Sequence, residues 1–393
     1  MKQHSWIMAQ NVTYWCFLIF FLNFLKRFDA VPLEFAPDDE TIYNEVQQLL
    51  SLNRAARHGV DVEDPNGDQN IQDDAINKPD IPRVVKNWPV DDLKLGQVTA
   101  VAVNSASQPV IFHRADRVWD RFTFNQTNHY QQSSLGPIQD HTVLTLNNLN
   151  GSILHKWGAN LFYMPHGLTI DRHDNLWITD VGMHQAFKFR PRESVPTLIF
   201  GELFEPGSDS KHLCKPTSIA VATTGEIFIA DGYCNSRILK YNAAGGLLRV
   251  IPNAAEFLSL QVPHSLALIE SIDRLCVADR ENMRVVCPRA GLFNVQSKKE
   301  PPLTIQQPDM GRLFAVAAKG KLIYAVNGFT NEMLPIQGFT IDPESETVIE
   351  HWAPENGFNN PHDIAVCANG SALYVAEIGP NKIWKFELVP PKK

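Results

Sequence analysis

One stretch of the sequence carries the pattern that decides the fold: Pro263-His264-Ser-Leu-Ala-Leu268, followed after a polar turn by Leu275-Cys-Val-Ala-Asp279. It combines a Pro-His start, an apolar run, a polar turn and a second apolar run that ends in an acid. Because short apolar runs bounded by turn residues are typical of buried strands, this stretch predicts two neighbouring antiparallel strands.

The same unit recurs along the chain at intervals of about fifty residues. Six copies can be recognised, at 97–114, 165–180, 216–231, 263–279, 312–326 and 361–377. The earliest copy is followed by an insertion before the second copy, and the copy at 312–326 matches the pattern less closely than the others. Six small antiparallel sheets in series predict an all-β fold, a six-bladed β-propeller of NHL-like repeats, because a closed ring leaves no long open edge. A β-sandwich with coincidental spacing is the alternative, and the strictness of the repeat argues against it.

Three histidines occupy equivalent places in alternate copies. His166 and His264 are 98 residues apart, and 98 residues separate His264 from His362. Each interval is two repeats, so in a six-bladed ring the three imidazoles converge on the axis from directions 120° apart. The copy at 216–231 has Thr217 at that place. A single Pro-His is usually an ordinary histidine, but three in symmetry predict one divalent metal with an open, catalytic side. Zinc suits imidazole best, and iron, cobalt or manganese stay open by residue type.

Three further side chains are expected on the face that carries the histidines. In each copy the second strand returns to the end where the first began, so Arg114, Tyr233 and Arg280 should lie near the metal. An adjacent cation favours the phenolate form of a tyrosine, which can then act as a general base. The alternative is that Tyr233 packs on the rim and both arginines bind surface carboxylates.

The N-terminal part differs from the propeller region, which we expect at 88–391. An apolar run at 15–25, too short to span a bilayer, followed by Ala30, predicts a signal peptide over 1–30, with an uncleaved anchor or a misread start as the alternatives. Residues 31–87 then form an extension with one short helix, roughly 39–52, and an acidic linker at 59–80. The mature protein is therefore expected to be secreted and to have no membrane span.

Composition agrees with a large, oxidised, soluble domain. The 393 residues are 44% hydrophobic with a formal net charge of −8, and no basic run indicates a nucleic-acid partner. Six cysteines fit an oxidising compartment. Cys16 would leave with the signal peptide, and the simplest arrangement of the other five pairs Cys214 with Cys234 and Cys276 with Cys287, leaving Cys367 as a buried thiol. Sequons make candidate glycan sites of Asn125, Asn150 and Asn369.

Several motifs resemble peptidyl-α-hydroxyglycine α-amidating lyase, the second catalytic unit of the peptide-amidating enzymes, over roughly residue 88 to the C-terminus. They are Val110-Ile-Phe-His-Arg114-Ala-Asp-Arg-Val-Trp119, Met164-Pro-His-Gly-Leu168, Asp231-Gly-Tyr-Cys-Asn-Ser-Arg237, Val262-Pro-His-Ser-Leu-Ala-Leu268, Cys276-Val-Ala-Asp-Arg-Glu-Asn282 and Pro361-His-Asp-Ile364. The resemblance implies cleavage of the N–Cα bond of a C-terminal α-hydroxyglycine, which releases a peptide amide and glyoxylate, in neuropeptide and hormone maturation.

The resemblance also implies residue roles. It implies His166, His264 and His362 as zinc ligands, Tyr233 as the base, Arg280 as the neighbour that favours its phenolate, and Arg114 as the partner of the substrate carboxylate. A structural calcium would be held by the carbonyls of Val101 and Leu168 and the carboxylate of Asp363. The two expected disulfides match those of the family.

Two departures from the family pattern have consequences. Asn360 precedes Pro361 where the family would have Met, so the surroundings of the third histidine are expected to bind substrate differently. We see no copper-binding monooxygenase unit, so a separate hydroxylating monooxygenase is expected to supply the substrate.

Two other function classes compete with this reading. A secreted propeller that binds partners without catalysis would not need the three histidines together with Tyr233. A calcium-dependent lactonase-type propeller would be expected to build its site mainly from acidic and amide oxygens.

Overall fold

A computed structural model describes residues 79–90, 92–253, 256, 258–293 and 300–391. The predicted signal peptide, the short helix and all but the last two residues of the acidic linker lie outside this part of the chain. Within it, no helix has the length and apolar character needed to cross a bilayer.

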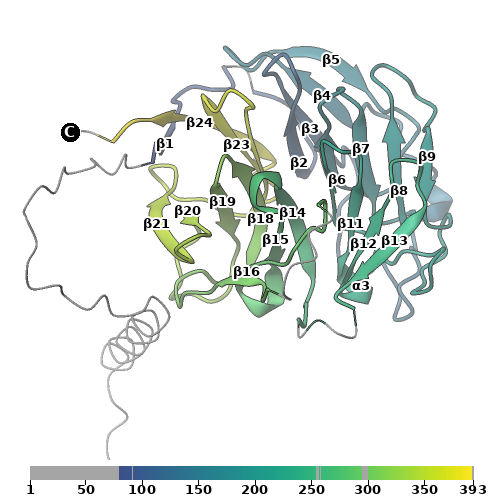
Figure 1. Ribbon diagram of the computed structural model, residues 1–393. Coiled ribbons are helices and arrows are strands. Elements are labelled where there is room, and N and C mark those ends of the chain that lie inside the picture. Colours follow the sequence, from purple (N-terminus) through teal and green to yellow (C-terminus); the bar gives the residue numbers. More distant parts are fainter. Residues whose placement is uncertain (1–78, 91, 254–255, 257, 294–299, 392–393) are drawn as a thin grey trace, which may run out of the picture. The chain divides into compact units, whose positions relative to one another are not determined.

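The described chain forms six antiparallel sheets of four strands each (Figure 1). The first three blades comprise β2 (Val98–Val103), β3 (Pro109–His113), β4 (Val143–Leu146) and β5 (Ile153–Trp157); β6 (Pro165–Ile170), β7 (Leu176–Asp180), β8 (Gln185–Phe189) and β9 (Leu198–Phe200); and β10 (Ser218–Val221), β11 (Ile227–Asp231), β12 (Arg237–Tyr241) and β13 (Leu247–Ile251).

The last three blades comprise β14 (Pro263–Ile269), β15 (Arg274–Asp279), β16 (Arg284–Cys287) and β17 (Leu303–Ile305); β18 (Leu313–Lys319), β19 (Leu322–Asn327), β20 (Gly338–Asp342) and β21 (Thr347–Trp352); and β22 (Pro361–Val366), β23 (Ala372–Glu377), β24 (Lys382–Val389) and β1 (Ile81–Val84). The short helices are α3 (Gly232–Asn235) and three 3₁₀ turns, η1 (Ser133–Leu135), η2 (Glu270–Ile272) and η3 (Arg280–Asn282).

The blades close into a ring. The first strands of successive blades contact one another in turn, and β22 of the last blade contacts β2 of the first. Apolar side chains fill the space between neighbouring blades; Phe339 and Ile341 of the fifth, for example, pack with Val285 of the fourth. The predicted six-bladed β-propeller is confirmed.

The last blade is completed by the start of the described chain. β1 pairs antiparallel with β24, with Ile81 opposite Val389 and Val84 opposite Phe386. The sequence pattern places the start of the propeller at residue 88, whereas the structure adds 81–84 to it. The pairing covers the backbone groups along the outer edge of β24, which would otherwise be an open sheet edge.

The first blade carries the insertion that lengthens the interval between the first and second copies of the repeat. Val103 pairs with Pro109 across a short turn, so β2 and β3 are joined directly. The insertion follows β3 and runs over 114–142, between β3 and β4, so the expected insertion before the second copy is confirmed. Its apolar residues are too scattered to predict a strand, so the repeat pattern did not predict its internal structure.

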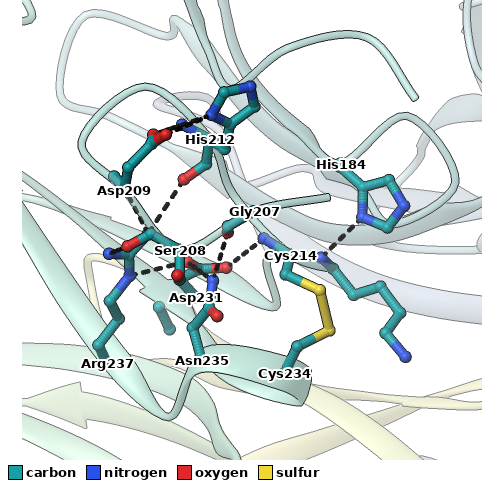
Figure 2. A network of polar contacts seen from close by, with 12 residues as sticks. His184, Gly207, Ser208, Asp209, His212, Cys214, Asp231, Cys234, Asn235 and Arg237 are labelled. Carbon is teal, nitrogen blue, oxygen red and sulfur yellow. Dashed lines mark hydrogen bonds and ion pairs between the residues drawn. A yellow bond between two sulfur atoms is a disulfide. The ribbon is translucent and has the colours of Figure 1, made fainter. Parts of the chain in front are cut away.

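The acid that ends the second strand of most copies has a structural role. The fully buried carboxylate of Asp231 accepts a hydrogen bond from the backbone N–H of Cys214 at 2.7 Å, and Asn235 and Arg237 also donate to it (Figure 2). Such bonds tie the segment before the first strand to the end of the second. The equivalent carboxylates, which accept backbone N–H groups in the same way, are Asp180, Asp279 and Glu377.

Candidate metal centre and active site

The three symmetric histidines meet at the axis of the ring. They lie near the starts of β6, β14 and β22, and His166, His264 and His362 are all at least 96% buried. Their candidate ligand nitrogens all lie within 4.8 Å of one another. One cation can be shared at that separation, because nitrogen ligands gather around a single ion in tetrahedral sites.

Each imidazole is oriented by a carbonyl from the neighbouring blade. Nδ1 of His166 donates to the carbonyl oxygen of Thr217 at 2.8 Å. The same contact is made by His264 to Phe314 and by His362 to Thr99, each at 2.6 Å. With the proton on Nδ1, the lone pair of Nε2 is available, which is the arrangement that metal-binding histidines adopt.

Burial keeps these imidazoles neutral. Loss of hydration and, after it, the nearby charge of Arg114 lower the pKa of His362 to about 3. The pKa values of His166 and His264 also fall well below the usual range, first because of burial and then because of the neighbouring His362. Neutral imidazole is the form that binds metal.

Tyr233 lies directly against this group. It sits in α3, immediately after β11, and its hydroxyl is 3.0 Å from Nε2 of His166 and 3.1 Å from Nε2 of His264. Burial raises the pKa of Tyr233, whereas the charges of Arg280 and Arg114 lower it. The arginines therefore act in the direction expected from the sequence, and the loss of hydration outweighs them.

Arg280 stacks beside the tyrosine. Its guanidinium carbon lies 5.3 Å from the centre of the Tyr233 ring and 5.1 Å from that of Phe314. Nε donates to Glu281 at 2.9 Å, so the cation is held by a carboxylate of its own turn. This geometry holds a positive charge next to the phenol.

Arg114 approaches from the first blade and is only 2% exposed. Nε donates to the carbonyl of Pro165 at 3.0 Å and Nη1 to Oε1 of Gln97 at 2.7 Å. Burial lowers the pKa of Arg114 to about 10, so the side chain stays charged near neutral pH. The structure thus brings Arg114, Tyr233 and Arg280 to the histidine end of the channel.

Comparison with known proteins places this site in a family. The NHL repeat family matches residues 213–241. Peptidyl-alpha-hydroxyglycine alpha-amidating lyase 2 of Drosophila melanogaster is 60% identical over 78% of this chain and 76% of its own length. The chain belongs to the peptidyl-α-hydroxyglycine α-amidating lyase family. A probable lyase of this name from Caenorhabditis elegans is 40% identical over 75% of this chain and 84% of its own.

Other comparisons bear on the amidating lyase family and on its fold. The peptidylglycine alpha-amidating monooxygenase of Rattus norvegicus is 39% identical over 83% of this chain, but the match covers 33% of that protein. Among solved structures, the nidogen/laminin complex has a chain with a TM-score of 0.52 at 12% identity, covering 74% of this chain and 95% of that one. The latter likeness concerns the fold alone.

Two aromatic side chains of this lyase-family site were given no role by sequence reasoning, although Trp119 ends one of the family motifs. Trp119 and Phe124 lie in the 114–142 insertion, and their ring centres are 5.2 Å apart. The Trp119 ring lies 5.0 Å from that of Tyr233, and the guanidinium of Arg114 is 5.3 Å from its centre. The usable signal was the unusual interval between β3 and β4 together with its aromatic content.

Both expected disulfides are present, and the predicted pairing is confirmed. Cys214 is bonded to Cys234 (Figure 2), the residue that follows Tyr233 in the sequence, and Cys276 is bonded to Cys287. Cys367 is free and buried, as expected. The first bridge joins the segment before β10 to α3, so it constrains the position of the phenol directly.

A cavity of about 310 Å³ continues along the axis from the histidines. Val101, Leu168 and Asp363, the residues expected for calcium, all line it. Oδ2 of Asp363 accepts the backbone N–H of Val101 at 2.9 Å, and burial raises the pKa of this carboxyl group to about 7. No Lys or Arg of the described chain forms an ion pair with it. A carboxylate that faces the cavity without a cationic side chain as partner has the chemistry of a cation ligand.

The three candidate glycan acceptors lie on the surface. Asn125, Asn150 and Asn369 are exposed, and the side-chain oxygen of each accepts hydrogen bonds within its own turn. Exposure makes them accessible to a glycosylating enzyme. Glycan attachment stays a prediction.

Proposed function

We propose that this chain is a zinc-dependent lyase that cleaves the N–Cα bond of a C-terminal peptidyl-α-hydroxyglycine to give a peptide amide and glyoxylate. The observation that carries the proposal is the contact between the Tyr233 hydroxyl and Nε2 of both His166 and His264. A general base and a metal-binding group are thereby joined in one site, in a chain 60% identical to a named lyase of this kind.

The donor set fits zinc. Three neutral imidazoles whose Nδ1 atoms are occupied by carbonyls present Nε2 toward one point, and one side remains for substrate. Zinc bound there would polarise the substrate oxygens and lower the pKa of the α-hydroxyl group. His166, His264 and His362 would hold it.

The remaining chemistry falls to side chains of the chain itself. Tyr233 accepts the proton of the α-hydroxyl group, and the oxygen forms the carbonyl of glyoxylate as the Cα–N bond breaks. The amide nitrogen leaves with the electron pair of that bond and takes up a proton. Arg280 holds positive charge against the Tyr233 ring, which favours the deprotonated form. Arg114 has guanidinium donors to spare for the substrate carboxylate, which planar bidentate pairing suits.

A structural calcium ion is proposed for the axial cavity. The carboxylate of Asp363 would be its charged ligand, with backbone carbonyls of Val101 and Leu168 as neutral ones, because calcium prefers oxygen ligands. The three residues come from three blades, the first, second and sixth. An ion at this place would tie the seam where the ring closes.

The proposed setting is the secretory pathway, in the maturation of neuropeptides and hormones. Two disulfides agree with an oxidising compartment. The hydroxylated substrate would come from a separate monooxygenase that oxidises the Cα of a C-terminal glycine. A relative named as a peptidylglycine alpha-amidating monooxygenase, which matches this chain over a third of its own length, supports the pairing of the two reactions.

The test is glyoxylate release from a synthetic peptidyl-α-hydroxyglycine by the purified protein, with and without a chelator. We expect release at neutral pH, its loss on chelation and its return with added zinc. A secreted propeller that only binds partners would release no glyoxylate beyond the uncatalysed rate under any of these conditions, and this result would overturn the proposal.

A further inference from the structure

We propose that Lys215 is a specificity-determining residue that binds an acidic side chain of the substrate, at the residue immediately before the α-hydroxyglycine. This inference rests on the proposed lyase function. It names a preference within the substrate class, peptides with Glu or Asp at that position.

The first observation is a partly buried ammonium group without a carboxylate. Nζ of Lys215 donates to Oδ1 of Asn128 at 2.9 Å and lies 4.8 Å from the centre of the Phe124 ring. It is also 6.0 Å from the centre of the Tyr233 ring, so it belongs to the surroundings of the active site. No carboxylate of the described residues forms an ion pair with it.

A second lysine of the same blade, Lys240, shows how a partly buried ammonium group is usually compensated. Nζ of Lys240 donates to two backbone carbonyls, those of Ala290 and Gly291, and lies 3.8 Å from Glu226. An ammonium group has three donors. Lys215 uses one of them on a neutral amide oxygen, which leaves two donors and an uncompensated charge for a ligand.

The second observation is the set of contacts that fixes the backbone of this lysine. The Lys215 N–H donates to Nδ1 of His184 at 3.0 Å, and the adjacent Cys214 is held by its disulfide. Lys215 itself has φ of 54°, a left-handed conformation that lysine seldom adopts. The hydrogen bond and the disulfide therefore hold the Lys215 backbone in place beside the active site.

The third observation is the row of groups that leads from Arg114 to Lys215. The Arg114 guanidinium lies 5.3 Å from the Trp119 ring centre, Trp119 is 5.2 Å from Phe124, and Phe124 is 4.8 Å from Nζ of Lys215. With the substrate carboxylate at Arg114, the peptide extends outward along the two aromatic rings. One extended residue advances about 3.4 Å, so a long acidic side chain on the residue before the α-hydroxyglycine is the part of the substrate that projects along this row toward the ammonium group.

Binding an acid there offsets a cost that the free protein bears. Burial lowers the pKa of Lys215, as expected for a cation that has lost part of its hydration without gaining a counter-charge. A substrate carboxylate restores the missing partner through charge-assisted hydrogen bonds, which are stronger than neutral ones. A neutral isostere of the same shape, glutamine in place of glutamate, gains the contact but not the charge.

The experiment compares two synthetic peptidyl-α-hydroxyglycines that differ only in Glu or Gln before the α-hydroxyglycine. Glyoxylate release by the full chain, loaded with zinc, gives kcat/KM for each, and the Glu/Gln ratio is the readout. We expect a ratio above one for the wild type. Lys215→Met should lower the Glu/Gln ratio about tenfold, which is the contribution of one charge-assisted contact. The change should come chiefly from a higher KM for the Glu peptide. Lys215→Arg should keep most of the ratio.

A matched control removes another lysine of the same kind. Nζ of Lys188 lies 5.0 Å from the centre of the Trp177 ring in the second blade, so Lys188→Met removes the same charge and a similar contact with an aromatic ring. Its Glu/Gln ratio should equal that of the wild type, because the substrate does not meet this lysine. A fall as large as that of Lys215→Met would mean that net charge alone sets the preference.

The other outcomes are equally informative. If Lys215→Met lowers kcat/KM for both peptides by the same factor, the Glu/Gln ratio is unchanged. The lysine then has a structural role or binds the α-hydroxyglycine carboxylate, and the inference is wrong. A wild-type ratio of one or less also overturns it, while the lyase function stands. If the wild type releases no glyoxylate from either peptide, the proposed function itself fails.

Discussion

The hydroxyl oxygen of Tyr233 lies 3.0 Å from Nε2 of His166, although the two residues come from neighbouring blades and are 67 positions apart in the sequence. The same oxygen is 3.1 Å from Nε2 of His264. The phenol therefore stands where two imidazole lone pairs converge. This contact connects the metal-binding group to the proton-transfer group without an intervening side chain.

Replacing Tyr233 by phenylalanine removes the proton acceptor and leaves the histidines in place. We expect glyoxylate release to fall by about 10² to 10⁴-fold, the contribution of a general base, with bound zinc per chain unchanged. Tyr241→Phe, a buried tyrosine in the same blade, is the control and should keep wild-type rates. Normal rates for Tyr233→Phe would show that another group takes the proton.

Loss of one ring histidine should abolish metal binding. We expect His264→Ala to copurify with far less than one zinc per chain and to lose activity, because two imidazoles bind zinc much more weakly than three. His351 supplies the control: its Nε2 lies 2.7 Å from Oδ2 of Asp309, and it is not one of the three axial histidines. Elemental analysis of His351→Ala should give one zinc per chain; equal zinc content in both variants would contradict the assignment.

The two disulfides should differ in their effect on catalysis. The bridges span 20 and 11 residues, so each adds about 3 kcal/mol to the free energy of unfolding by loop-closure entropy. Replacing Cys214 and Cys234 by serine should also lower kcat, because this bridge positions α3 and Tyr233. The Cys276 and Cys287 double variant, in which paired strands β15 and β16 hold the hairpin, should keep kcat. Equal losses of kcat would refute this division.

His184 should make the protein acid-sensitive. Burial lowers its pKa to about 4, and the charges of Lys215 and His129 act in the same direction. Between the usual value of about 6.5 and about 4, the unfolded chain binds a proton that the folded chain does not, so stability falls as pH falls. Full titration would cost about 3 kcal/mol.

The measurement is urea unfolding at several pH values between 7.5 and 4.5. His184→Gln should have a slope of unfolding free energy against pH smaller by up to one proton, about 1.4 kcal/mol per pH unit, than the wild type. The other buried histidines contribute equally to both proteins and cancel in the difference. Parallel curves would show that His184 titrates normally.

The start of the propeller can be located by truncation. A chain beginning at residue 79 keeps β1 and should fold, whereas one beginning at residue 88 leaves the edge of β24 unpaired. We expect the shorter chain to melt at a lower temperature and to self-associate, as open sheet edges do. Thermal unfolding and size-exclusion chromatography compare the two; identical behaviour would mean that β1 is dispensable.

The repeat pattern was sufficient to predict the ring of histidines. His166, His264 and His362 are equally spaced by two repeats. In a closed ring of six blades, two repeats correspond to a rotation of 120°, so the spacing alone places the three imidazoles around one axis. The second strand of each blade returns to the end at which the first strand begins. This alternation predicted that Arg114 and Tyr233 lie near the histidines. These inferences needed only chain connectivity and strand alternation.

Other parts of the site carry no such periodic signal. The acceptors for the histidine Nδ1 atoms are backbone carbonyls, for which residue type is irrelevant: Thr217, Phe314 and Thr99 share no chemistry. Trp119 lies in an insertion outside the repeat, so its place depends on tertiary packing. The pairing of β1 with β24 joins segments about three hundred residues apart, which no local pattern encodes.

His362 lies on β22, in the one blade assembled from both ends of the propeller. Its imidazole is oriented by the carbonyl of Thr99 in the first blade, so the third ligand takes its place on the axis only when the ring has closed. A metal ion at the centre would then report on completed assembly: chains interrupted before residue 361 supply two imidazoles, and half-joined rings hold the ion loosely. Completion of the ring and catalysis would thus depend on the same metal ion.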